Sequence, residues 1–259
     1  MQRIRFYVNT VKTDAASIRQ RLSAMASAHG LIGVEDGTAE AIIALGGDGT
    51  ILRAVHQFPD LPILGFNLGG LGYLASVEER EFEHALSCLA DDEYSISSRR
   101  LVEAEGGFAA LNDIVVMREG SGHSVRLDLE ADGKLVTRYM VDGLIFATPT
   151  GSTAYSLAAG GPVLMPDSNC FVVTPINPHA LGVRPLVVDD SVRFNVTARD
   201  RTEDGVGVYA DGEKVKSLVN GETITIKKSL RTAKLIALNG YDPYEVLARK
   251  LGWSGSNVR

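Results

Sequence analysis

The residues best suited to chemistry form a short glycine-rich run, Gly-Gly-Asp-Gly-Thr at 46–50. Glycines let a backbone approach a ligand closely, and backbone N–H groups at a helix start bind phosphate oxygens. A simple phosphate loop does not require Asp48, because a carboxylate repels phosphate unless it binds a metal ion or accepts a proton or hydroxyl group. The run therefore predicts a phosphate site with a chemically active aspartate; the alternative is a tight turn with an Asx-type hydrogen bond.

Two further clusters carry polar groups suited to a nucleotide. An apolar strand at 143–147 leads into a hydroxyl-rich loop at 148–156, where Tyr155 offers a flat face to a nucleobase, although an isolated aromatic residue there is more often part of a core. The pair Asn112 and Asp113 could grip both hydroxyls of a ribose, since the carboxylate accepts hydrogen bonds and the amide both donates and accepts. The same dipeptide is also compatible with an ordinary turn.

Other motifs are weak or missing. The run at 70–75 fits the loose G-x-G-x-x-A dinucleotide pattern, but it follows the third strand instead of the first. The sequence lacks G-x-S-x-G, H-E-x-x-H, the Walker motif and paired C-x-x-C motifs, and its five histidines show no zinc spacing. Cys88 and Cys170 are far apart in sequence, which predicts two reduced core thiols.

Strands that alternate with helices must position the first loop. The strands are expected at 3–9, 39–45 and 62–67, and the helices at 14–29, from 51, and at 78–89. Gly30 is expected to cap the first helix, whose Ile18, Leu22 and Met25 share one face. This alternation predicts a parallel sheet with helices on its faces.

From about Tyr94 the pattern changes to short strands with alternating polarity. Asp132-Gly133 and Asp211-Gly212 each separate two such strands, at 125–130 and 134–139 and at 206–210 and 213–215, and Asp-Gly favours a type I′ hairpin turn. Short helices are expected at 153–159 and 243–251. The predicted organisation is an α/β domain at 1–95 and a β-rich domain at 96–242, with the segment 243–259 able to pack back on the first domain.

Composition excludes several classes of protein. The 259 residues, 45% of them hydrophobic and 22% charged, suit one large or two small globular domains. The net charge of −6 argues against a nucleic-acid partner. No apolar run approaches the roughly 18 residues of a membrane-spanning helix, and the first residues lack a signal-peptide core, so we expect a cytoplasmic protein without a membrane partner.

These motifs together resemble the NAD kinase family. The resemblance rests on 46–50, on Asn67 to Leu74, on Asn112-Asp113, on the run 142–161 and on 174–186, which occur in the family's order. It implies an α/β domain followed by a β-rich domain, with the active site between them, and a homodimer or homotetramer. The implied reaction transfers the γ-phosphoryl group of ATP, or of polyphosphate in some members, to the adenosine 2′-hydroxyl of NAD. A divalent ion, normally Mg²⁺, would be bound mainly through the nucleotide phosphates, with no protein metal ligands assigned.

The resemblance also assigns roles to individual residues. Asp48 would orient the 2′-hydroxyl and accept its proton, while Asn112 and Asp113 would bind the ribose. Asp142 would lie at the nicotinamide end of the dinucleotide. The phosphate-binding residues would be Gly46, Gly47, Gly49 and Thr50, and the remaining contacts to NAD, besides Asp48 and Gly49, would be Arg53, His123, Thr153, Ala154, Tyr155, Ser156, Leu157, Ala158, Asn177 and Glu213.

The chain departs from the family pattern at two of these places. Met140 stands where the family commonly has Arg two residues before Asp142, and Arg138 lies two residues further back. Glu213 replaces a common Gln, which would bring a negative charge near the dinucleotide. The Met140 departure is expected to affect one ligand contact, and with it the preference for substrate or the response to NADPH.

Two other functions remain open at this stage. A lipid or small-alcohol kinase can use the same glycine loop, although the run at 142–156 and the lack of an apolar membrane-facing stretch argue against it. A non-catalytic sensor of NAD or NADP is also compatible, but it would leave the combination of phosphate loop and Asp48 unexplained.

Overall fold

The computed structural model describes residues 1–8, 15–35, 37–68, 72–74, 77–120, 123–199 and 205–253. The chain divides into two units: unit 1 contains 1–98 and 233–259, and unit 2 contains 99–232. Part of the loose dinucleotide motif, Gly70, Leu71 and Ala75, lies outside the described residues, as do Asn9 and Asp14 at the expected ends of the first strand and first helix.

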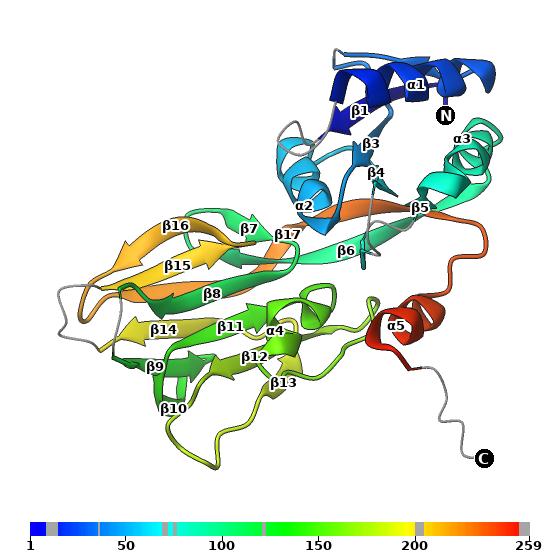
Figure 1. Cartoon of the computed structure of the whole chain (residues 1–259). Helices are drawn as coiled ribbons and strands as arrows, with labels where there is room; N and C mark the ends of the chain where they lie inside the picture. The colour runs from blue at the N-terminus through cyan, green and yellow to red at the C-terminus, as the bar shows by residue number, and fades with distance from the viewer. Residues whose placement is uncertain are drawn as a thin grey trace, which may run out of the picture. The chain divides into compact units, whose positions relative to one another are not determined.

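The first apolar segments of unit 1 form a parallel sheet (Figure 1). Its strands lie in the order β2 (Ile32–Gly33), β1 (Arg3–Val8), β3 (Ala41–Leu45) and β4 (Ile63–Asn67). Every residue of β3 and β4 is buried, as expected for parallel strands that are covered on both faces. The predicted parallel α/β arrangement is therefore confirmed.

Helices also belong to unit 1. They are α1 (Ala15–Ala28), α2 (Asp48–Gln57), the 3₁₀ turn η1 (Glu79–Glu81), α3 (Phe82–Ala90) and α5 (Pro243–Leu251). Leu22 is fully buried, Ile18 and Met25 pack against the same cluster, and Gly30 follows the helix with φ of 77°. The predicted apolar face and terminal glycine of α1 are thus confirmed.

Unit 2 consists of two antiparallel sheets. One has the order β13 (Leu186–Asp189), β12 (Cys170–Ile176), β11 (Gly143–Ala147), β8 (Asp113–Arg118), β15 (Val206–Ala210) and β16 (Glu213–Leu218). The other pairs β10 (Lys134–Val141), β9 (Val125–Ala131), β14 (Phe194–Ala198) and the first part of β17 (Thr223–Leu238). The change from parallel α/β to antiparallel β structure agrees with the change of sequence pattern at Tyr94.

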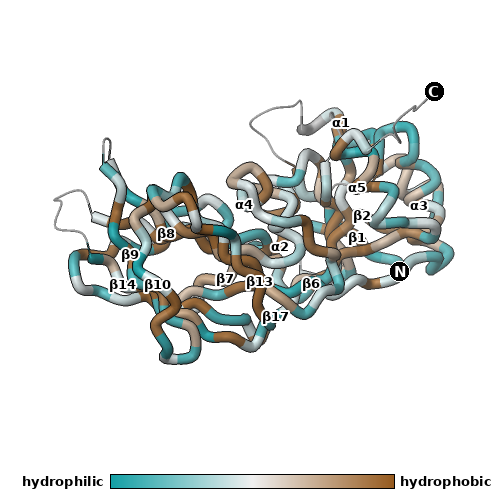
Figure 2. Tube along the Cα trace, turned by 90° about the horizontal axis from the view of Figure 1, so that it is seen from below, coloured by the Kyte–Doolittle hydropathy of each residue, from teal (hydrophilic) through white to brown (hydrophobic). Residues whose placement is uncertain are grey.

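The two sheets of unit 2 share one hydrophobic core. Alternate residues of both sheets meet there, among them Leu127 and Phe194 from one sheet and Ile114 and Phe146 from the other. Figure 2 shows hydrophobic residues concentrated along the strands. A second cluster on the other face of β8, β11 and β12 packs against Ala159 and adjoining residues.

Both Asp-Gly hairpins adopt the predicted turn. Asp132 and Gly133 have φ of 49° and 75°, and Asp211 and Gly212 have φ of 47° and 86°. Positive φ at both central residues is the signature of a type I′ turn.

Two long strands occur in both units. β6 (Tyr94–Ala104) pairs with β17 and with the short β7 (Phe108–Ala110), while β17 also pairs with β4 through Leu235 and Ile63. The short β5 (Val77–Glu78) extends β4 in parallel. Within the part of the chain that the structure describes, no helix has the length and apolarity needed to cross a membrane.

Candidate functional site

The glycine loop joins the end of β3 to the start of α2 in unit 1. Gly46 has φ of 150°, and a Cβ atom there would lie 2.3 Å from the Thr50 hydroxyl oxygen, so the position accepts no side chain without rearrangement. Gly47 is the residue before the helix, and no side chain caps the helix end. The Gly46 N–H donates to the Phe66 carbonyl oxygen at 2.9 Å and the Thr50 N–H to the Gly47 carbonyl oxygen at 2.8 Å, so the backbone of the loop is fixed at both ends. Phosphate binding at this helix start stays a prediction.

Asp48 begins α2 and connects it to the segment 72–74. Its two carboxylate oxygens accept hydrogen bonds from the backbone N–H groups of Tyr73, at 2.7 Å, and Leu74, at 2.9 Å. The aspartate is therefore held in one orientation at the mouth of the glycine loop. Asp48 therefore lies at the helix start, and its role beside a phosphate group stays a prediction.

A lysine beside the same loop was missed by the sequence reasoning. The Lys250 ammonium group of α5 lies 4.7 Å from the centre of the Tyr73 ring, and its charge is coupled to that of Asp48. Burial lowers the pKa of Lys250, and the Asp48 charge opposes that decrease. Burial and then the Asp48 charge raise the pKa of Tyr73. No local motif signals Lys250, because these contacts join residues nearly two hundred positions apart in sequence.

Arg53 lies on the exposed side of α2. The buried residues of this helix include Ile51, Ala54 and Val55, so Arg53 points away from the core of unit 1. It follows the loop by one turn of helix, where a long basic side chain can reach an anion at the helix start.

In unit 2, Asn112 and Asp113 lie at the start of β8. Asp113 is buried, and its carboxyl group receives no hydrogen bond from the described residues. Burial, followed by the charge of Asp211, raises the pKa of Asp113 from 3.8 to about 7. A largely desolvated carboxyl group with its acceptor positions unoccupied is the kind of group that a functional site contains.

The backbone of this pair is held by a neighbouring hairpin. The Asp211 carboxylate accepts hydrogen bonds from the N–H groups of Leu111 at 2.8 Å, Asn112 at 2.7 Å and Asp113 at 3.2 Å. Asp211 was predicted only as a turn residue, and its side-chain contact was not foreseen. The sequence signal was limited to the Asp-Gly turn itself.

The hydroxyl-rich loop after β11 contacts the same segment. The Thr148 hydroxyl donates to the Leu111 carbonyl oxygen at 2.6 Å, and the Thr148 N–H donates to the Asn112 carbonyl oxygen at 2.9 Å. A Cβ atom on Gly151 would lie only 2.0 Å from the Asn112 carbonyl oxygen, so glycine is required for this approach. The second and third sequence clusters are therefore in direct contact, which their spacing did not reveal.

The expected helix at 153–159 is a pair of short turns. The 3₁₀ turn η2 (Gly151–Thr153) precedes α4 (Tyr155–Ala158). Tyr155 is 42% exposed and is not a core residue, so its ring is free to meet a ligand. Ser156 is fully buried, and its hydroxyl oxygen lies 2.8 Å from that of Thr174, so Ser156 stabilises the turn from inside. The other predicted adenine-site residues are Thr153, Ala154 and Leu157, which are partly buried, and Ala158, which is exposed.

Asp142 and Asn177 are brought together by adjacent strands. The Asn177 amide nitrogen donates to one Asp142 oxygen at 2.9 Å, and the Arg118 guanidinium lies 3.3 Å from the other. Asn177 follows β12 and has φ of 47°. His123 and Glu213 are exposed, and the described residues show no hydrogen bond or ion pair from either side chain to the other candidate residues.

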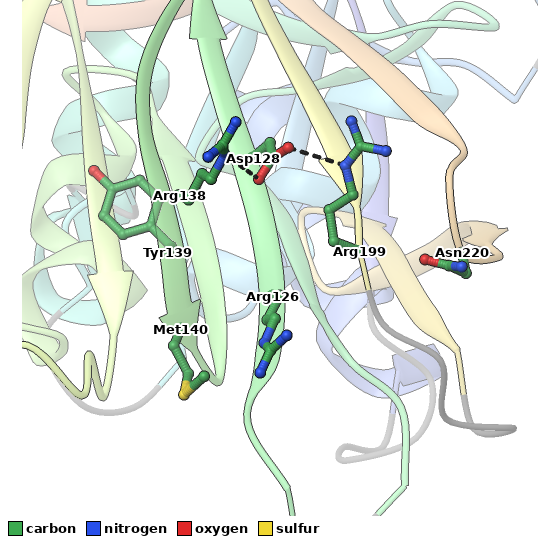
Figure 3. A pocket seen from close by; sticks show the side chains of 7 residues that line it. All are labelled: Arg126, Asp128, Arg138, Tyr139, Met140, Arg199 and Asn220. Atoms are coloured by element: carbon green, nitrogen blue, oxygen red, sulfur yellow. Dashed lines mark hydrogen bonds and ion pairs between the residues drawn. The ribbon is translucent and has the colours of Figure 1, made fainter.

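Met140, which stands where the family commonly has Arg, lines a cavity of unit 2. This cavity of about 880 Å³ is lined by Arg126, Asp128, Arg138, Tyr139, Met140, Arg199 and Asn220 (Figure 3). Arg138 and Arg199 lie 3.8 and 2.9 Å from the Asp128 carboxylate. The positive charge of Arg138 is thus directed to Asp128, while Arg118 is the basic partner of Asp142.

Comparison with known proteins identifies the family of the chain. The model of the ATP-NAD kinase N-terminal domain matches residues 5–94, and that of the ATP-NAD kinase C-terminal domain matches residues 111–238. The chain belongs to the NAD kinase family. The matched ranges contain both the glycine loop and the Asn112-Asp113 pair.

Named relatives support the family assignment over most of the chain. The NAD kinase of Syntrophotalea carbinolica is 40% identical over 227 residues, which is 84% of this chain and 79% of that protein. The NAD kinase of Prosthecochloris aestuarii is 36% identical and covers 95% of both chains. The crystal structure of an NAD kinase from Archaeoglobus fulgidus in complex with ATP covers 98% of this chain and 100% of that chain, with a TM-score of 0.84 and 29% identity. Yeast NADH kinase complexed with NADH has the same fold, with a TM-score of 0.85 and 24% identity over 99% of this chain and 89% of that chain.

Proposed function

We propose that this NAD kinase transfers the γ-phosphoryl group of ATP to the 2′-hydroxyl of the adenosine ribose of NAD and so produces NADP. The observation that carries the assignment of substrate is the buried Asp113 carboxyl group beside Asn112. A glycine phosphate loop alone suits many kinases, whereas a carboxyl and an amide held side by side suit the vicinal hydroxyls of a ribose. Asp113 accepts hydrogen bonds from these hydroxyls, and Asn112 both donates and accepts.

The loop of unit 1 supplies the groups that act on the phosphates. N–H groups at the start of α2 bind phosphate oxygens, apart from those of Gly46 and Thr50, which donate to the carbonyl oxygens of Phe66 and Gly47. Arg53 adds positive charge one turn later. The two Asp48 oxygens accept hydrogen bonds from the backbone N–H groups of Tyr73 and Leu74, which hold the carboxylate in one orientation. A carboxylate held in this way orients the 2′-hydroxyl for in-line attack and takes its proton late. Phosphoryl transfer has a loose transition state, so positioning and charge neutralisation provide most of the catalysis.

The turns at 151–158 form the adenine site in this proposal. The exposed Tyr155 ring stacks on the base, while Thr153 and Ala154 line the site and Ser156 fixes the turn through Thr174. Asp142 and Asn177 contact the nicotinamide end. His123 and Glu213 are assigned to the dinucleotide by resemblance to the family alone.

A divalent ion, Mg²⁺, completes the proposed reaction. No group of three or more His, Cys, Asp or Glu side chains that could hold a metal ion occurs among the described residues. The residues present fit an ion that arrives on the nucleotide, because the loop offers one carboxylate, Asp48, next to N–H groups that take phosphate oxygens. When bound, the ion neutralises charge on the β- and γ-phosphates. Polyphosphate is the alternative donor, and we propose a cytoplasmic homodimer or homotetramer.

Replacement of Asp48 tests this function. The purified protein should convert NAD to NADP with ATP and Mg²⁺, and a matrix of ATP and polyphosphate against NAD and NADH defines the donor and acceptor. Asp48→Asn should lower kcat by about 10²–10⁴-fold, the usual contribution of a proton-accepting group, while the variant still binds NAD. Glu83→Gln, which removes an exposed carboxylate from the first turn of α3, is the matched control and should retain full activity. Full activity in Asp48→Asn would overturn the role of Asp48.

A further inference from the structure

The tip of the β15–β16 hairpin is held against the start of β8. Asp211 is the first central residue of the type I′ turn that joins β15 to β16, and Ala210 just before it pairs with Ile114 of β8. The backbone N–H of Asp211 donates to the Asp113 carbonyl oxygen at 3.0 Å. The turn therefore continues the ladder between these strands by one residue and places the Asp211 side chain beside the segment 111–113.

The Asp211 backbone donates a hydrogen bond to this segment, whereas the Asp211 side chain accepts hydrogen bonds from it. Its two oxygens accept the backbone N–H groups of three consecutive residues, Leu111, Asn112 and Asp113, at 2.8, 2.7 and 3.2 Å. Hydrogen bonds to an ionised acceptor are about twice as strong as those between neutral groups. Three such bonds from one carboxylate fix the backbone from which both proposed ribose-binding side chains project.

The loop after β11 closes the opposite side of the segment. Thr148 binds the carbonyl groups of Leu111 and Asn112, and Gly151 lies directly against the Asn112 backbone. The carbonyl groups are thus held by Thr148 and the N–H groups by Asp211. Of these two residues, Asp211 alone carries a charge, and that charge lies next to the buried Asp113 carboxyl group.

We propose that Asp211 is a positioning residue for substrate binding, which fixes the Asn112-Asp113 pair through its backbone and places a carboxylate beside the buried Asp113 side chain. This role rests on the proposed function, because it takes Asn112 and Asp113 as the ribose-binding pair. It adds a group that does not touch the substrate but sets the geometry and the charge of the groups that do.

The groups around Asp113 determine the pKa of its carboxyl group and therefore the pH dependence of NAD binding. Burial raises the pKa of the Asp113 carboxyl group most, and the Asp211 charge raises it further, to about 7. From β11, on the other side of β8, Ala147 pairs with Asp113 and carries no charge. Two ribose hydroxyls that donate to Asp113 favour its ionised form, so NAD binding releases a proton near neutral pH and weakens as the pH falls below about 7.

Two variants at Asp211 separate these effects. Asp211→Asn keeps a residue that favours the type I′ turn but removes the charge, and Asp211→Gly removes the whole side chain while glycine still accepts the positive φ. Asp132→Asn is the matched control, because Asp132 begins the other type I′ Asp-Gly turn of unit 2, and among the described residues its side chain accepts a single backbone hydrogen bond, from the Arg193 N–H at 3.0 Å. Circular dichroism and thermal melting show whether each variant is folded.

Amide hydrogen exchange tests the backbone contact without any ligand. In Asp211→Gly the amides of residues 111–113 should exchange faster than in the wild type, whereas Asp132→Asn should leave them unchanged. Unchanged exchange of these amides in Asp211→Gly would overturn the positioning role.

Calorimetry of NAD binding in two buffers of different ionisation enthalpy measures how many protons are released when NAD binds. The wild type should release about half a proton per NAD bound at pH 7, the value expected when a group titrating at about 7 becomes fully ionised. Asp211→Asn should release less, and the weakening of NAD binding should move to lower pH. A wild-type protein that neither binds nor phosphorylates NAD refutes the proposed function itself. Tight NAD binding in the wild type with an identical pH profile in Asp211→Asn refutes only the role of Asp211.

Discussion

Replacement of Asp113 by Asn should stabilise the protein at neutral pH while it removes the proposed ribose contact. The folded protein holds the Asp113 proton up to about pH 7, whereas the unfolded chain releases it near 3.8. Between these values the folded state binds more protons than the unfolded state, so this carboxyl group lowers the free energy of unfolding as the pH rises. This decrease in the free energy of unfolding is absent below about pH 3.8 and complete above about pH 7.

The size of the effect follows from the same shift. Each pH unit of the interval contributes 1.36 kcal/mol, so roughly three units correspond to about 4 kcal/mol of destabilisation by the ionised carboxyl group. Asn has nearly the same shape and no charge to bury. The difference in unfolding free energy between Asp113→Asn and the wild type should therefore grow from pH 4 to pH 7 and then stay constant.

Urea unfolding at half-unit intervals from pH 4 to pH 8.5, followed by circular dichroism, measures this difference. Asp167→Asn, at an exposed position of unit 2, controls for the loss of one charge and should show a small, pH-independent difference. The reasoning is refuted if the difference in unfolding free energy between Asp113→Asn and the wild type stays constant from pH 4 to pH 8.5. The buried carboxyl group would then have no pH-dependent effect on stability.

Two further predictions concern packing and cysteine chemistry. Gly151→Ala places a methyl group 2.0 Å from the Asn112 carbonyl oxygen, so it should lower the unfolding free energy by at least about 1–3 kcal/mol, whereas Gly182→Ala, with no neighbouring atom within 4 Å, should not. Equal melting temperatures for the two variants would contradict this. Burial raises the pKa of the thiols of Cys88 and Cys170, so the folded protein should react with iodoacetamide at pH 7.5 much more slowly than the urea-unfolded chain. Mass spectrometry that finds equal rates in both states would show that the thiols are accessible.

The parts of the structure that depend on local sequence could be predicted. The Asp-Gly turns at 132 and 211 were recognised because positive φ at two successive residues restricts the choice of amino acid. The buried strand before the glycine loop was recognised from its unbroken apolar run, since a strand covered on both faces needs no alternation.

Contacts between distant segments could not be predicted in this way. The hydrogen bonds of Asp211 to the segment 111–113 span about a hundred residues, and the contact between Lys250 and Tyr73 spans even more. Nothing in the residues around Asp211 distinguishes it from Asp132, whose turn has the same sequence and backbone. Periodicity likewise could not decide whether Tyr155 is buried or exposed, because α4 is too short to define a face.

The division of the chain has a consequence for the order in which the protein can fold during synthesis. Unit 1 needs residues from both ends of its sequence: Ile236 of β17 belongs to its core, and α5 supplies Lys250 over Tyr73 and Arg249 at 3.4 Å from Glu78. Domains usually fold as units in the order of their synthesis. Here the β-rich unit, which is continuous in sequence, is fully translated before unit 1 has received its last strand and helix. The glycine loop is made early, but the surroundings of Asp48 are finished only when α5 has left the ribosome. A chain interrupted after unit 2 would therefore carry a folded β-rich unit together with a unit 1 that lacks α5 and the end of β17.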